Sequence, residues 1–135
     1  MYRAIDVARY VVQKCIDLGH PITNVQLQLL LAYIQHDWDE GRLVFFDNVE
    51  HWDFGPCIPN VYYEYGNNGS LPIDVAGKGE PIKPKDAEKF NWQVIWYLVC
   101  VLRDRGVLSA LSQGRFKTKY SRMRDEKEAI KNENC

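Results

Sequence analysis

Residues 23–34 read TNVQLQLLLAYI, and this run predicts the helix around which the rest of the chain is arranged. Thr23 is followed three residues later by Gln26, which is the spacing of a capping box, so the helix is expected to begin near Asn24. It is expected to continue to about Glu40, because a glycine follows. Apolar residues cover nearly all of its sides, which predicts a central helix with other elements packed against several faces.

An amphipathic helix is predicted on the N-terminal side of this run. Between Arg3 and Leu18 the apolar residues recur at intervals of three and four, the period of a helix with one buried face. Gly19 favours the end of that helix.

A pair of short extended segments is predicted on the C-terminal side. Leu43–Phe46 and Val49–Phe54 are rich in aromatic and β-branched residues, and they flank Asp47–Asn48, which favours a turn. A stiff connector with two prolines follows, and Asn60 is then predicted to cap a short helix that ends at Gly66. This pattern predicts a small β-hairpin or extended pair followed by a helical turn.

Helical periodicity returns after a loop rich in glycine and proline. It runs from Pro84 to Arg105–Gly106, and a last helix is predicted over about 109–112. The expected fold class is therefore mainly α: a compact helical domain with a short β-hairpin or extended pair after the second helix. Residues 1–124 are expected to form this single domain, and 125–135 a charged, flexible tail.

Composition excludes several classes of protein. The 135 residues are 46% hydrophobic and 26% charged, which suits one globular domain and disfavours disorder. No apolar run is long enough to span a bilayer, and we expect no signal peptide at the start of the chain. The four cysteines lack C-x-x-C spacing and are expected to be reduced thiols, so a cytoplasmic protein is predicted.

Two blocks of sequence carry a resemblance to a known family. One is residues 21–35, and the other is residues 43–73, in which five residues follow the pattern Trp-x-x-Gly-Pro-x-x-Pro-x-Val-Tyr: Trp52, Gly55, Pro56, Pro59 and Tyr62. These blocks resemble the Panacea domain, whose family includes SocA-like antitoxins and phage-associated GepA proteins. The resemblance implies an antitoxin that neutralises a cognate toxin, encoded next door, by direct binding. The alternative it implies is a phage or prophage protein that antagonises host machinery or defence nucleoproteins, or a protease adaptor.

The Trp-to-Tyr motif itself has two interpretations. Its aromatic residues could form a recognition surface, since Trp and Tyr are frequent binding hot spots. We favour a structural corner, in which the prolines and the glycine fix the backbone while Trp52 and Tyr62 cover the crossing. Tyr63 cannot face inward together with its neighbours on a helix, so it is the better candidate for a partner contact.

Charge suggests further partner contacts. Six acidic residues and one arginine lie between Asp37 and Asp53, and a basic partner could contact this segment, especially at Asp37, Asp39 and Glu40. Residues 103–124 hold seven basic residues and one acid, so a contact with RNA or DNA is an alternative there. We favour a solvated helix face, because the net charge of the whole chain is -1, and nucleic acid is a disfavoured partner. Three basic residues of this segment remain candidates for a protein partner: Arg115, Lys117 and Lys119.

Catalysis and cofactors are not expected. His36 and Glu40 lie one helical turn apart, but no further cluster of ligands completes a metal set. Cys57 has no paired histidine, and Gly77-Lys78-Gly79 lacks the context of a phosphate loop. The chain is therefore predicted not to be an enzyme and to need no cofactor or metal.

Overall fold

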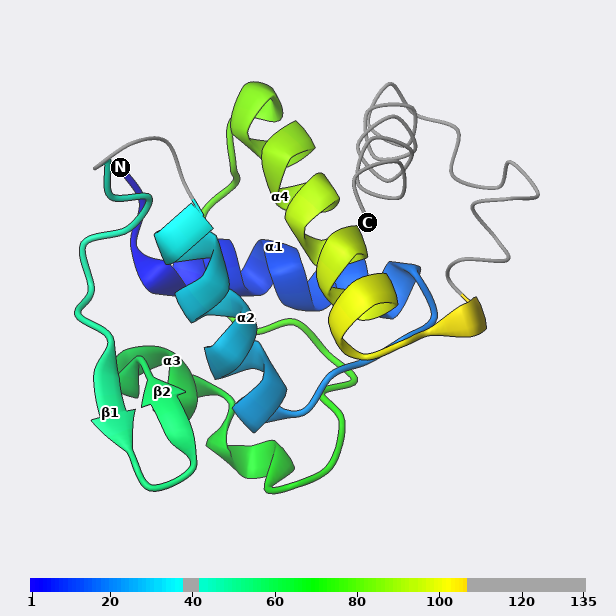
Figure 1. Cartoon of the computed structure of the whole chain (residues 1–135). Helices are drawn as coiled ribbons and strands as arrows, with labels where there is room; N and C mark the ends of the chain where they lie inside the picture. The colour runs from blue at the N-terminus through cyan, green and yellow to red at the C-terminus, as the bar shows by residue number, and fades with distance from the viewer. Residues whose placement is uncertain (38–41, 107–135) are drawn as a thin grey trace, which may run out of the picture. The chain divides into compact units, whose positions relative to one another are not determined.

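The computed structural model describes residues 1–37 and 42–106 (Figure 1). Contacts divide the chain into two compact units, one of Met1–Lys83 and one that begins at Pro84. The prediction of a mainly α fold with a hairpin after the second helix is confirmed. The predicted helix near 109–112 and the predicted tail at 125–135 lie outside the described residues.

Helix α1 spans Ala4–Asp17, close to its predicted limits. The apolar positions that predicted it are buried, and its N-terminus is fixed by a residue far along the chain: the backbone N–H of Ala4 donates to Asp47 Oδ1 at 2.8 Å. A helix N-terminus has N–H groups without intrahelical acceptors, so this carboxylate satisfies one of them and suits the local positive potential.

Helix α2 spans Asn24–Asp37 and begins as its capping box predicted. The backbone N–H of Thr23 donates to Gln26 Oε1 at 2.9 Å, and the backbone N–H of Gln26 donates to Thr23 Oγ1 at 3.2 Å. The helix contacts α1, α3 and β2 (Figure 1). Only part of the expected burial is present, because Val25 and Leu29 are each 44% exposed on the remaining side.

Strands β1 (Glu50–Trp52) and β2 (Gly55–Cys57) form the antiparallel hairpin. Its predicted turn at Asp47–Asn48 is wrong: the chain reverses at Asp53–Phe54, and Trp52 pairs with Gly55. Gly55 has a φ of +127°, a conformation that residues with a side chain rarely adopt. Asp47 does not turn the hairpin because its carboxylate is engaged elsewhere, with Ala4 and with the side-chain amide of Asn60.

The segment before the hairpin pairs with the N-terminus instead of with Val49–Phe54. Tyr2 and Phe45 form an isolated parallel bridge, in which the backbone N–H of Tyr2 donates to the Val44 carbonyl at 2.9 Å. The side chain of Gln35 on α2 takes the place of a neighbouring strand: its Oε1 accepts from the N–H groups of Val44 and Phe45, and its Nε2 donates to the Phe45 carbonyl. The local periodicity of the sequence predicts neither the bridge between Tyr2 and Phe45 nor the hydrogen bonds of Gln35.

Helix α3 spans Pro59–Glu64 and is attached to α2 by a row of buried amides. The backbone N–H of Ile58 donates to Gln28 Oε1 at 2.8 Å, Gln28 Nε2 donates to Asn24 Oδ1 at 3.0 Å, and Asn24 Nδ2 donates to the Tyr62 carbonyl at 2.9 Å. We call this row the amide ladder. The predicted cap at Asn60 is wrong, because Ile58 precedes the helix and Pro59 is its first residue, where proline needs no N–H partner.

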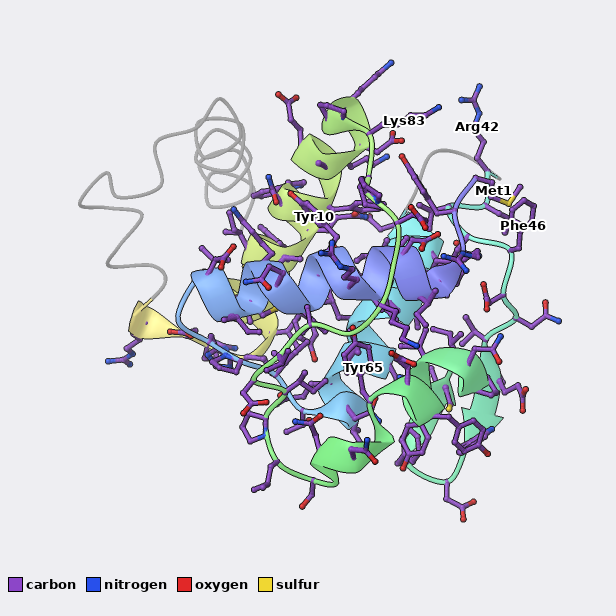
Figure 2. All side chains as sticks on the ribbon, turned by 180° about the vertical axis from the view of Figure 1, so that it is seen from behind. Met1, Tyr10, Arg42, Phe46, Tyr65 and Lys83 are labelled. Atoms are coloured by element: carbon purple, nitrogen blue, oxygen red, sulfur yellow. The ribbon has the colours of Figure 1, made fainter. Side chains whose placement is uncertain are left out.

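The segment from Gly66 to Lys83 begins with a 3-10 turn, Gly66–Asn68, and then crosses α1 (Figure 2). Asp6, which is 5% exposed, holds it there: Asp6 Oδ1 accepts the backbone N–H of Glu80 at 2.7 Å. The hydroxyl oxygen of Tyr65 accepts the backbone N–H of Gly77 at 2.9 Å. These two contacts fix the path of a loop that has no regular elements after the 3-10 turn.

The second unit contains α4 (Pro84–Trp96), which continues into a π-helical turn, Tyr97–Val101. The expected single helix to Arg105–Gly106 is therefore wrong in its last part. Arg103 has a φ of +59°, which breaks the helical path. No helix in the described part of the chain is both long and apolar enough to cross a membrane.

Candidate functional site

Four aromatic side chains from the hairpin and α3 form one connected group in the first unit. Trp52 ends β1, Phe54 lies in the hairpin turn, and Tyr62 and Tyr63 lie on α3. The Trp52 ring centroid is 6.0 Å from that of Phe54, 5.4 Å from that of Tyr62 and 6.2 Å from that of Tyr63, all edge-to-face. Phe54 and Tyr62 stack at 5.3 Å with 24° between their planes. We call these four residues the aromatic cluster.

Backbone features explain why these rings meet. The tight turn needs the conformation that Gly55 provides, and it places Trp52 and Phe54 on the same short hairpin. The amide ladder fixes α3 at the backbone of Ile58 and Tyr62, which brings the two tyrosines to the hairpin. Figure 1 shows β1 and β2 beside α3.

The aromatic cluster is open to solvent. Tyr63 is 69% exposed and Phe54 is 38% exposed, while Trp52 and Tyr62 are partly buried. Trp52 is therefore not fully buried, and its indole N–H donates to Glu50 Oε1 at 3.1 Å. The predicted outward position of Tyr63 agrees with its exposure, and its contact with a partner stays a prediction.

A polar cavity of about 220 Å³ lies next to the cluster. Two carboxylates, two side-chain amides and two apolar side chains line it. These residues are Asp47, Asn48, Glu50, Ile58, Pro59 and Asn60. We call it the acidic cavity. Glu50 belongs to its wall and also binds the Trp52 indole, so the cavity and the aromatic cluster adjoin.

The segment that forms both features carries charges of one sign. Residues 43–66 contain four acidic side chains and neither lysine nor arginine, and the four are Asp47, Glu50, Asp53 and Glu64. Glu64 also fixes the neighbouring loop, because its Oε1 accepts the backbone N–H of Lys78 at 3.3 Å. The surface is therefore aromatic at its centre and mainly anionic at its edge, where Asp47 also interacts electrostatically with Arg3.

The remaining predicted site residues fall in different places. Gly55 and Pro56 lie in β2, and Pro59 begins α3 and lines the acidic cavity. Asp37 is exposed at the last residue of α2. Five of the predicted partner-binding residues lie outside the described residues, and these are Asp39, Glu40, Arg115, Lys117 and Lys119.

Two thiols of the described residues, those of Cys15 and Cys57, are not poised for nucleophilic attack. Burial raises the pKa of the Cys15 thiol to about 12, and burial followed by the nearby Glu50 charge raises the pKa of Cys57. The thiolate is the reactive form of cysteine, so both remain in the inert form at neutral pH. Within residues 1–37 and 42–106, no group of three or more His, Cys, Asp or Glu side chains could hold a metal ion.

Reasoning from the sequence missed Phe54 and Glu64 as members of this surface, together with three residues that line the acidic cavity: Asn48, Ile58 and Asn60. It included Asp47, Glu50 and Asp53 only as members of the acidic segment between Asp37 and Asp53. Alternation in the hairpin could have indicated Phe54, because residues two apart on an extended segment face the same side, as Trp52 and Phe54 do. The bond between Glu50 and Trp52 joins residues two apart for the same reason.

Comparison of the chain with family models, with curated proteins and with solved structures finds no match. Function must therefore be argued from the residues and from the surface that they form.

Proposed function

We propose that the chain is a cytoplasmic antitoxin that neutralises a cognate protein toxin by binding it directly through the aromatic cluster. One observation carries this proposal: four aromatic rings contact one another at the surface, and two of them, Phe54 and Tyr63, are well exposed. Exposed aromatic groups of this kind are frequent anchors of protein interfaces, because covering them removes much apolar surface from water.

The position of the cluster in the sequence supports the same proposal. Trp52 and Tyr62 belong to the motif on which the resemblance to Panacea antitoxins rests. A stoichiometric inhibitor needs a rigid surface and no reactive group. The amide ladder and the hairpin supply the rigidity. Rigidity favours binding, because a surface that is already ordered loses little entropy when the partner binds.

The test is rescue of growth. The gene adjacent to that of the chain is expressed from an inducible promoter, with and without the chain, and growth is followed together with complex formation in gel filtration. We expect the adjacent product to arrest growth, the chain to relieve the arrest, and the two proteins to elute together. Tyr63→Ala should lose the rescue while its circular dichroism and melting temperature stay unchanged.

Leu71→Ala is the matched control, because Leu71 is as exposed as Tyr63, at 69%, and belongs neither to the aromatic cluster nor to the lining of the acidic cavity. It should rescue growth like the unmodified chain. The proposal fails if the adjacent product is harmless, or if Tyr63→Ala binds and rescues as well as the control does.

A further inference from the structure

We propose that the aromatic cluster and the acidic cavity together form a docking site for a basic, arginine-bearing segment of the partner protein. This inference rests on the proposed function and adds to it the chemistry of the segment that is bound.

The aromatic half of the site suits a planar cation. The edge-to-face contacts of Trp52 tie the group together, and Tyr63 and Phe54 remain exposed beside it. The face of an aromatic ring carries partial negative charge, so guanidinium groups stack on Trp and Tyr with favourable energy. A hydrophobic residue next to the arginine would cover the rest of the aromatic surface.

The anionic half suits the same group. Asp47 and Glu50 line the acidic cavity, and Asp53 lies in the adjoining hairpin turn. A carboxylate oxygen accepts more than one hydrogen bond, so the existing bonds of Asp47 to Ala4 and Asn60 leave it able to attract a cation at the cavity. Arginine donates bidentate bonds to carboxylates and also stacks on aromatic rings, whereas lysine acts mainly as a point charge.

Charge complementarity decides between occupants. Residues 43–66 supply four carboxylates and neither lysine nor arginine, and one of the four, Asp47, interacts electrostatically with Arg3, whose guanidinium is hydrogen-bonded to Asp6. An acidic segment or a nucleic-acid phosphate would be repelled there, and a wholly apolar segment would add no counter-charge to the carboxylates. Basic residues also gain long-range attraction to this surface, which speeds association.

The experiment uses the full chain, labelled with ¹⁵N, and a short peptide of alternating arginine and leucine as the probe. The matched peptides carry glutamate or lysine in place of arginine. We expect the arginine peptide to shift the Trp52 indole N–H signal and the Tyr63 backbone signal saturably, and more weakly at high ionic strength. The lysine peptide should bind less tightly, and the glutamate peptide should give no shift.

Glu50→Gln is the decisive variant, because glutamine keeps an oxygen that can accept the Trp52 indole N–H but loses the charge. It should weaken binding of the arginine peptide about fivefold. Asp74→Asn is the control, since Asp74 is exposed and lies outside the site, and it should leave the affinity unchanged.

Equal binding of the glutamate peptide, no response to Glu50→Gln, or no shift with any peptide would overturn the inference. If Tyr63→Ala still abolishes rescue in that case, the aromatic cluster binds the toxin through other chemistry and the proposed function stands. If the arginine peptide binds as expected but rescue does not depend on Tyr63, the site recognises basic segments and the antitoxin proposal falls.

Discussion

Replacing Asp6 by alanine should release the segment that crosses α1 and lower the stability of the first unit. Asp6 is almost completely buried, and its carboxylate accepts four hydrogen bonds: from the backbone N–H of Glu80 at 2.7 Å, and from the backbone N, Nε and Nη2 of Arg3 at 3.3, 3.1 and 2.8 Å. The guanidinium of Arg3 is solvated, so we assign no stabilisation to that pair. Loss of the charged acceptor of Glu80 alone costs about 2 kcal/mol.

That loss should appear both globally and locally. In a unit of the size of Met1–Lys83 it corresponds to a fall in melting temperature of about 8 to 16 °C. Hydrogen exchange should also show reduced protection of the Glu80 amide, while amides in the centre of α1 stay protected. Asp74→Ala, which removes an exposed carboxylate, serves as the control and should change stability by less than about 0.5 kcal/mol.

The effect should depend on pH. Burial alone would raise the pKa of Asp6, but the hydrogen bonds from Arg3 and Glu80 outweigh it and lower the pKa below its ordinary value of 3.8. A lowered pKa in the folded state means that Asp6 contributes stability above that ordinary value and loses the contribution as pH falls through the folded pKa. The gap between the unmodified chain and Asp6→Ala should therefore be full at neutral pH and shrink in acid. Unchanged Glu80 exchange, or a gap that persists at low pH, would refute this account.

Three other predictions follow from burial and hydrogen bonding. Gln28→Leu should cost about 2 to 3 kcal/mol in urea unfolding, because it leaves the buried N–H of Ile58 without an acceptor; a smaller loss would mean that water replaces the amide. Phe45→Ala should lower the free energy of unfolding by about 3 to 5 kcal/mol, because Phe45 is fully buried, and Trp52→Ala should lower it clearly less. Equal losses in thermal melts would mean that Trp52 contributes to the core as much as Phe45 does. Cys15 should resist a thiol reagent in the native state and react after unfolding, and rapid native labelling would contradict its raised pKa.

Helices with a clear period and a cap could be predicted from sequence, because the forces that set them are local. The limits of α1 and the capping box at Thr23 are of this kind. The hairpin was predicted, but its turn was not, because Asp47–Asn48 has good turn chemistry and a distant N–H, that of Ala4, engages Asp47 instead. Propensity at one position cannot register a hydrogen-bond donor supplied more than forty residues away.

The candidate site was predictable only in outline. The motif indicated Trp52 and Tyr62, and helical geometry indicated that Tyr63 is exposed. The acidic cavity could not be predicted, because it forms only when the segment before β1 meets the start of α3. Polar residues at 24 and 28 in an apolar helix were the one local signal of the amide ladder, since buried amides persist only where they find partners.

The amide ladder attaches α3 through main-chain atoms, the N–H of Ile58 and the carbonyl of Tyr62. Every amino acid except proline carries both of these groups, so the attachment does not depend on which side chains α3 presents to solvent. Mutation can therefore change Tyr63 and its exposed neighbours without loosening the frame that holds them. A surface built in this way can acquire a new binding specificity through a few substitutions while the fold beneath it stays the same.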